Sequence, residues 1–92
     1  MSRIDIEAFA IDDDNEEKFA SHGLTATRIV QVLDGPMVVV PNRKARRATY
    51  LLIGRDHGGG CIAIPIEPTF DPTVWRPVTA WPCKRHEQAR LA

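Results

Sequence analysis

The chain has 92 residues, of which 43% are hydrophobic and 26% are charged, and its 12 basic and 12 acidic residues give a formal net charge of zero. This length excludes a second hydrophobic core, and this composition excludes the disordered, collagen-like and disulfide-stapled classes. We therefore expect residues 1–92 to form one small domain of marginal stability, for which a partner or a second copy could matter.

The charges are distributed unevenly along the chain. Residues 1–34 carry three basic and eight acidic side chains, whereas residues 35–92 carry nine basic and four acidic ones. The densest basic cluster consists of Arg43, Lys44, Arg46 and Arg47. Such a cluster either attracts a polyanion or is a solvated loop between two strands, and the sequence leaves both interpretations open.

The first third of the chain predicts a strand and two helices. Residues 4–11 alternate in polarity, which is typical of a half-buried strand. The acidic run at 12–15 supplies an N-cap for a helix that should end at His22 and Gly23. Thr25 is the expected N-cap of a second helix. The apolar side chains of that helix share one face and are Ala26, Ile29, Val30 and Leu33.

The rest of the chain predicts strands with short connections. These strands are expected at residues 37–40, 49–55, 61–66 and 75–81. The glycine run at 58–60 leads into a strand, so it indicates a hairpin turn, and Pro82 begins a short basic helix. Because closely connected strands pair antiparallel, we expect an α+β fold: a small antiparallel β-sheet packed against two N-terminal helices, with a short C-terminal helix.

Location and redox state follow from what the sequence lacks. No basic stretch followed by an apolar run begins the chain, and its apolar runs are far shorter than the roughly 20 residues that span a bilayer. We therefore expect a cytoplasmic protein that does not bind a membrane. Cys61 and Cys83 lie 22 positions apart without a CxxC motif, so we expect two reduced, packed thiols and no metal site.

Cationic and phenolic side chains are the main candidates for chemistry. Tyr50 and Arg55 belong to one predicted strand, and Arg76 belongs to the last one. If these strands lie close together, the guanidinium groups and the phenol would line a single sheet face or edge, hold phosphates and stabilise a developing oxyanion without a metal. The alternative is a solvated strand rim. His22 is either an acid/base group or a cation that interacts with the helix dipole.

Several short motifs occur in a characteristic order along nearly the whole chain. They are the acidic run at 12–15, His22-Gly23, the second amphipathic helix with Asp34 and Pro36, the segment TYLLIGR at 49–55, the segment WRPVTA at 75–80, and a terminal helix with Glu87. This order resembles the BrnT family of toxins from bacterial type II toxin–antitoxin pairs, whose fold is RelE-like. The resemblance covers almost every predicted element.

The resemblance implies a ribonuclease that needs neither metal nor cofactor, inhibits translation by cutting RNA, and is held inactive by a small DNA-binding antitoxin protein. Matched to the family's motifs, the catalytic residues would be His22, Tyr50, Arg55 and Arg76. In this interpretation the RNA phosphates are bound by the basic cluster Arg43, Lys44, Arg46 and Arg47.

The last predicted strand motivates a second hypothesis. It reads Thr79-Ala80-Trp81 where many members of that family have Ser-Ala-Arg, so one basic side chain expected at the RNA site is absent. The chain would then be a catalytically inactive relative that acts as a protein-interaction or self-associating module, for example a homodimer. Its contact surface would be anchored by exposed Trp75 and Trp81.

Overall fold

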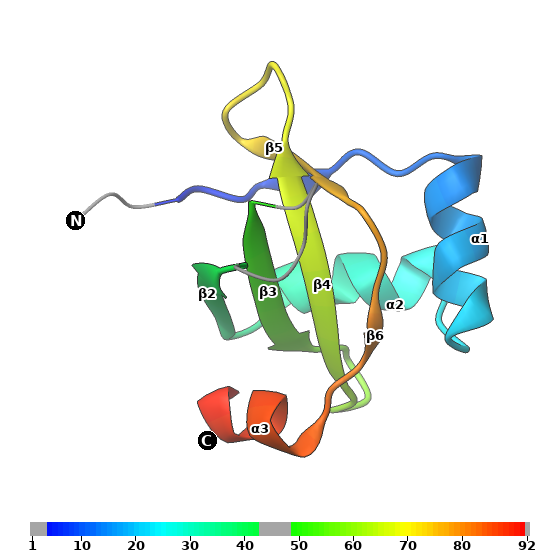
Figure 1. Cartoon of the computed structure of the whole chain (residues 1–92), viewed down its shortest axis with the longest axis vertical. Coiled ribbons are helices and arrows are strands. Elements are labelled where there is room, and N and C mark those ends of the chain that lie inside the picture. The colour runs from blue at the N-terminus through cyan, green and yellow to red at the C-terminus, as the bar shows by residue number, and fades with distance from the viewer. Residues whose placement is uncertain (1–3, 43–48, 92) are drawn as a thin grey trace.

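A computed structural model describes residues 4–42 and 49–91 and confirms the α+β class (Figure 1). The basic cluster Arg43, Lys44, Arg46 and Arg47 lies outside the described residues. The described elements, in chain order, are β1 (Ala8–Phe9), α1 (Asp13–Ser21), α2 (Ala26–Gln31), the 3-10 turn η1 (Val32–Asp34), β2 (Met37–Pro41), β3 (Tyr50–Arg55), β4 (Cys61–Pro68), β5 (Val74–Pro77), β6 (Trp81–Pro82), α3 (Arg85–Gln88) and the 3-10 turn η2 (Ala89–Leu91).

The sheet is mixed, with one parallel pair that the sequence did not predict. Its strand order is β1-β5-β4-β3-β2, and β6 also pairs with β4. The strands β2 to β6 pair antiparallel as expected, whereas β1 runs parallel to β5. The strand expected at 4–11 is limited to Ala8–Phe9, because only these two of its residues pair with another strand, at Val74 and Trp75.

The strand expected at 75–81 is divided into β5 and β6, which pair with the two ends of β4. Pro77 ends β5, and a proline has no backbone N–H to continue a ladder. The Val78 N–H donates to the Pro65 carbonyl oxygen at 2.8 Å, so the chain stays along β4 between the two short strands. The C-terminal residues therefore return to the first part of β4.

Local capping signals position the two N-terminal helices as expected. The backbone N–H groups of Asp12 and Asn15 each donate to the other residue's side chain, at 3.0 and 2.9 Å, which caps α1. His22 ends this helix, and Gly23 follows with a φ of 75°, a conformation that favours glycine. The Thr25 hydroxyl caps α2 by accepting from the Arg28 N–H at 3.3 Å.

The main core lies between these helices and one side of the sheet, which we call the first face. Buried apolar side chains from α1, α2 and η1 meet those of β3 and β4; among them are Phe19, Ile29, Val32, Leu52, Ile62, Ile64 and Ile66. Val30 was predicted to face this core but is 47% exposed. Ile29 and Val32, three positions apart, are fully buried and define the inward side of the helix, and Val30 lies outside this stripe and faces solvent.

Gly54 explains how closely η1 approaches the sheet. It is buried in β3 opposite Met37, and a Cβ at this position would collide with the Val32 side chain. Only glycine lets the turn lie directly on the strand at this point. The position of α2 and η1 on the first face therefore depends on a missing side chain as well as on apolar contacts.

The opposite side of the sheet, the second face, carries the residues that alternate with those of the core. Ile53 and Ala63 are fully buried there, and the turn η2 contacts both β2 and β3. We call residues 81–91 the C-terminal segment; it comprises β6, α3 and η2. In the part of the chain that the structure describes, no helix has the length and apolar character needed to cross a membrane.

Candidate functional site

The predicted catalytic tyrosine packs against the core. Tyr50 is half-buried at the start of β3, on the first face, and joins the cluster that surrounds Leu52. Its ring meets that of Trp75 edge-on, with 5.6 Å between the ring centroids and 74° between the planes. Trp75 itself is only 8% exposed and donates its indole N–H to the Asp5 carbonyl oxygen at 3.1 Å. The prediction that Trp75 is an exposed anchor is therefore wrong; Trp75 is a core residue.

Arg55 lies on the other side of the same strand. Successive side chains of a strand point to opposite faces, and Arg55, five positions after Tyr50, is exposed on the second face. Its guanidinium donates one hydrogen bond, to the Gly59 carbonyl oxygen at 3.1 Å. Among the residues described, no carboxylate forms an ion pair with it. Arg55 is therefore a cation available to a ligand, but the sheet separates it from the Tyr50 phenol.

Arg76 is already occupied by two carboxylates. Its Nη1 lies 2.5 Å from Asp12 Oδ2, and its Nε lies 3.3 Å from Glu67 Oε1. The Asn15 backbone N–H, and after it the Arg76 guanidinium, lower the pKa of Asp12 below its ordinary value of 3.8. Arg76 thus links β5 to the start of α1, and a phosphate would have to displace two acidic groups to reach it.

His22 lies far from this cluster. It is exposed and directly follows α1, whereas Asp12, the partner of Arg76, precedes the helix. The nine residues of α1 span about 14 Å at the usual rise of 1.5 Å per residue. The structure therefore does not bring the four predicted catalytic side chains together on one face, and their catalytic roles stay a prediction.

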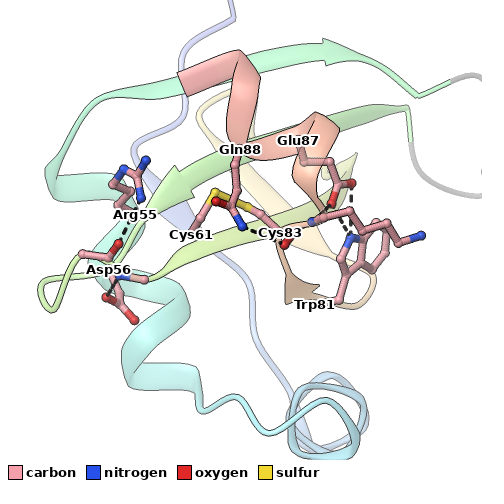
Figure 2. Close-up of a disulfide and its surroundings, with 10 residues drawn as sticks. Arg55, Asp56, Cys61, Trp81, Cys83, Glu87 and Gln88 are labelled. Atoms are coloured by element: carbon pink, nitrogen blue, oxygen red, sulfur yellow. Dashed lines mark hydrogen bonds between the residues drawn. A yellow bond between two sulfur atoms is a disulfide. The ribbon is translucent and has the colours of Figure 1, made fainter. Parts of the chain in front are cut away.

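The structure instead brings a disulfide next to Arg55. Cys61 faces Arg55 across the β3–β4 ladder, and it is bonded to Cys83, with 5.3 Å between the two Cα atoms (Figure 2). The expectation of two reduced thiols is wrong for this structure. The spacing of 22 residues carries no signal, since the two cysteines meet only because β6 returns along the first part of β4.

A buried carboxylate holds the helix that follows the disulfide. Glu87 is 3% exposed and accepts hydrogen bonds from the Trp81 indole N–H at 3.0 Å and from the Lys84 backbone N–H at 2.7 Å (Figure 2). The Lys84 ammonium lies 5.9 Å from the Trp81 ring centroid, within cation–π distance. The acidic group thus points inward while Lys84 and Arg85 are exposed.

These positions define a candidate site that we call the cationic strip: Arg55, Lys84 and Arg85. Arg55 faces Cys61 across the β3–β4 ladder, and the other two residues directly follow Cys83, so the disulfide joins the two segments that carry these cations. Exposed guanidinium and ammonium groups can bind the phosphates of a nucleic acid strand. Sequence reasoning selected Arg55 but missed the other two, because the contact between Cys61 and Cys83 joins residues that are distant in sequence.

A histidine–carboxylate pair lies elsewhere, at the β3–β4 turn. His57 Nε2 is 2.7 Å from Asp34 Oδ2, and the His57 backbone N–H donates to Gln31 Oε1 at 3.1 Å. Both ionisable side chains are more than half exposed, beside a shallow depression that Ala26 and Val30 also line. The pair ties the turn to α2 and η1, but no predicted catalytic residue lines this depression.

Two further observations concern metal ions and relatives. Within residues 4–42 and 49–91, no group of three or more His, Cys, Asp and Glu side chains is arranged to hold a metal ion. The comparisons with known proteins add no family: neither a scan of protein-family models nor a search of curated proteins returned a match to this chain.

Proposed function

We propose that this protein is the toxin component of a type II toxin–antitoxin pair, and that it binds RNA along the cationic strip and cuts it without a metal, which inhibits translation. The observation that carries the proposal is the state of Arg55, which is exposed and has no carboxylate partner among the described residues. Arg76, by contrast, is neutralised by Asp12 and Glu67. The strip is therefore the more favourable place for a polyanion.

The location and partner follow from this function. A toxin that cuts RNA acts in the cytoplasm, and its antitoxin, a small DNA-binding protein, would cover the second face and block the strip. The described chain also separates its charges along the sequence, because the strip belongs to β3 and the C-terminal segment while the exposed acidic residues of α1 lie near the N-terminus. An RNA backbone would therefore approach the strip and be repelled from α1.

A second candidate function is favoured by the placement of the other predicted catalytic groups. The Tyr50 ring packs against Trp75, and Arg76 is held by two carboxylates, so neither is free to serve a reacting phosphate in this conformation. A protein with such a site would bind without cutting. This is the catalytically inactive interaction module, with the strip and the half-buried Trp81 as its contact surface.

The test combines growth arrest on expression with binding and cleavage of single-stranded RNA by the purified chain. Arg55→Ala and the double variant Lys84→Ala/Arg85→Ala should each weaken RNA binding. The slope of the logarithm of the binding constant against the logarithm of the salt concentration should become shallower by about 0.7 for each cation removed. Lys18→Ala is the matched control, since it removes an exposed cation from α1.

The possible results separate the two functions. Growth arrest and RNA cleavage that Arg55→Ala abolishes and Lys18→Ala leaves intact support the toxin. RNA binding of the expected salt dependence without cleavage supports the inactive module. A wild-type chain that binds no RNA at low salt contradicts the proposed function.

A further inference from the structure

The Cys61–Cys83 disulfide is not enclosed in the core. Both cysteines are half-buried and lie on the second face, where Cys61 pairs with exposed Arg55 (Figure 2) and Cys83 precedes exposed Lys84 in the chain. Thiol–disulfide exchange requires that an attacking thiolate reach a sulfur atom, and neighbouring cations attract this thiolate and stabilise the one that leaves. Access and local charge thus both favour reduction at this position.

Few other contacts hold the chain beyond β6 to the sheet. Among the described residues after Pro82, one backbone hydrogen bond reaches the sheet, from the Cys83 N–H to the Cys61 carbonyl oxygen at 3.0 Å. The side chain of Gln88 bonds within residues 83–91, whereas Glu87 accepts hydrogen bonds from the Lys84 N–H and from the indole of Trp81 in β6. The remaining attachment is the contact of η2 with β2 and β3. The disulfide is therefore the covalent tether of residues 83–91, and the other attachments are this polar link and the contact of η2.

We propose that the Cys61–Cys83 disulfide is a site of thiol–disulfide exchange with a dithiol reductant, and that its reduction releases residues 83–91 from the second face while the rest of the sheet stays folded. The first thiolate of the reductant attacks one sulfur, the protein S–S bond breaks, and the other cysteine leaves as a thiolate. The second thiol of the reductant then attacks the mixed disulfide. Two electrons pass to the protein, two protons complete its thiols, and the dithiol becomes a disulfide.

Release would uncover the apolar residues of the second face and separate the parts of the cationic strip. Ile53 is fully buried in β3, which η2 contacts, so release of η2 would remove cover from this part of the second face. Lys84 and Arg85 would no longer be held on the same side as Arg55. In a reducing compartment such as the cytoplasm, where persistent disulfides are rare, this bond would act as a sensor rather than as a permanent staple.

Hydrogen exchange on the intact chain tests the proposal without any RNA, so its result is independent of the proposed function. The oxidised protein is compared with the protein reduced under native conditions by dithiothreitol or by a thioredoxin-type dithiol protein, and reduction is verified by the mass of two added hydrogens. The amides of Cys83, Glu87 and Gln88, which are hydrogen-bonded in the oxidised form, should exchange at least about tenfold faster after reduction. The amides of the β3–β4 ladder, such as those of Leu52 and Ile64, should keep their protection.

Two controls identify the cause. The double variant Cys61→Ser/Cys83→Ser should exchange like the reduced protein whether or not dithiothreitol is added, and oxidised dithiothreitol should have no effect on the wild type. The proposal is overturned if reduction leaves the three C-terminal amides protected, if the bond is reduced only after denaturation, or if β3 and β4 lose protection to the same degree as residues 83–91.

Discussion

The two faces of the sheet are covered in different ways. On the first face, the helices bury large apolar side chains such as Phe19, Ile29 and Val32, which are fully buried. On the second face, the four-residue helix α3 is held by a disulfide and by the Glu87–Trp81 hydrogen bond. A chain of 92 residues has few apolar side chains to distribute. Most of the large buried side chains therefore lie on the first face, whereas the second face, which buries Ile53 and Ala63, also depends on covalent and polar links.

The largest effect on stability is expected from removing a core side chain on the first face. Phe19→Ala removes a fully buried ring from α1 and leaves a cavity among β4 residues and Ile29, which should lower the free energy of unfolding by about 4 kcal/mol. Urea denaturation followed by circular dichroism measures it. The matched control is Phe70→Ala, because Phe70 is fully exposed and its loss should change stability by less than about 0.5 kcal/mol. Equal effects of the two variants would contradict this account of the core.

Loss of the disulfide should lower the free energy of unfolding somewhat less than Phe19→Ala does. Cys61→Ser/Cys83→Ser opens a loop with a sequence separation of 22, and the chain-entropy model gives a loss of about 3 kcal/mol in the free energy of unfolding. The same denaturation experiment, performed in oxidising buffer, measures the difference between wild type and variant. Addition of dithiothreitol should bring the wild type to the value of the variant. A difference below about 1 kcal/mol would mean that the reduced chain gains other contacts on the second face.

The first face could be predicted well from sequence because its signals are local. Asp12 and Thr25 cap helices through residues three positions away, and Gly23 ends a helix through its own backbone conformation. Periodicity also found β2, β3 and most of β4. It misplaced Val30, because the buried stripe of the helix runs through Ile29 and Val32 and leaves Val30 outside it.

The second face and the candidate site could not be predicted in this way. The disulfide and the pairing of β1 with β5 join residues that are distant in sequence, and no local pattern encodes either contact. Tyr50 and Arg55 were expected to converge, yet their places on one strand already put them on opposite faces once the core is assigned to the Tyr50 side. Strand alternation was therefore the signal that could have corrected this expectation.

A smaller effect is expected at the polar link of the second face. Glu87→Ala removes the acceptor of the Trp81 indole N–H and of the Lys84 backbone N–H, which should lower stability by about 1 to 2 kcal/mol. The change should also alter the fluorescence of Trp81, while that of Trp75 in the core stays constant. Glu17→Ala, at an exposed position of α1, is the control and should leave both signals unchanged. A silent Glu87→Ala would mean that the disulfide and the contact of η2 hold the segment without this polar link.

The smallest effect is expected at an ion pair that ties the β3–β4 turn to α2, and it depends on pH. The Arg28 guanidinium, 2.8 Å from Asp56, and after it the Gly60 N–H lower the pKa of Asp56 below its ordinary value of 3.8. Because the folded pKa lies below the unfolded one, this carboxylate stabilises the fold above pH 3.8 and ceases to do so as the pH falls through the lower folded value.

Asp56→Asn should therefore lower the free energy of unfolding at pH 7 by no more than about 1 kcal/mol, since Arg28 is partly exposed, and the difference from wild type should shrink below pH 3.8. Urea denaturation at a series of pH values measures it, with exposed Asp5→Asn as the control. If the difference in the free energy of unfolding stays constant down to the lowest pH, the destabilisation comes from the hydrogen bond that Asp56 accepts from the Gly60 N–H and not from the ion pair. The turn, like the second face, would then be held by hydrogen bonds rather than by charge.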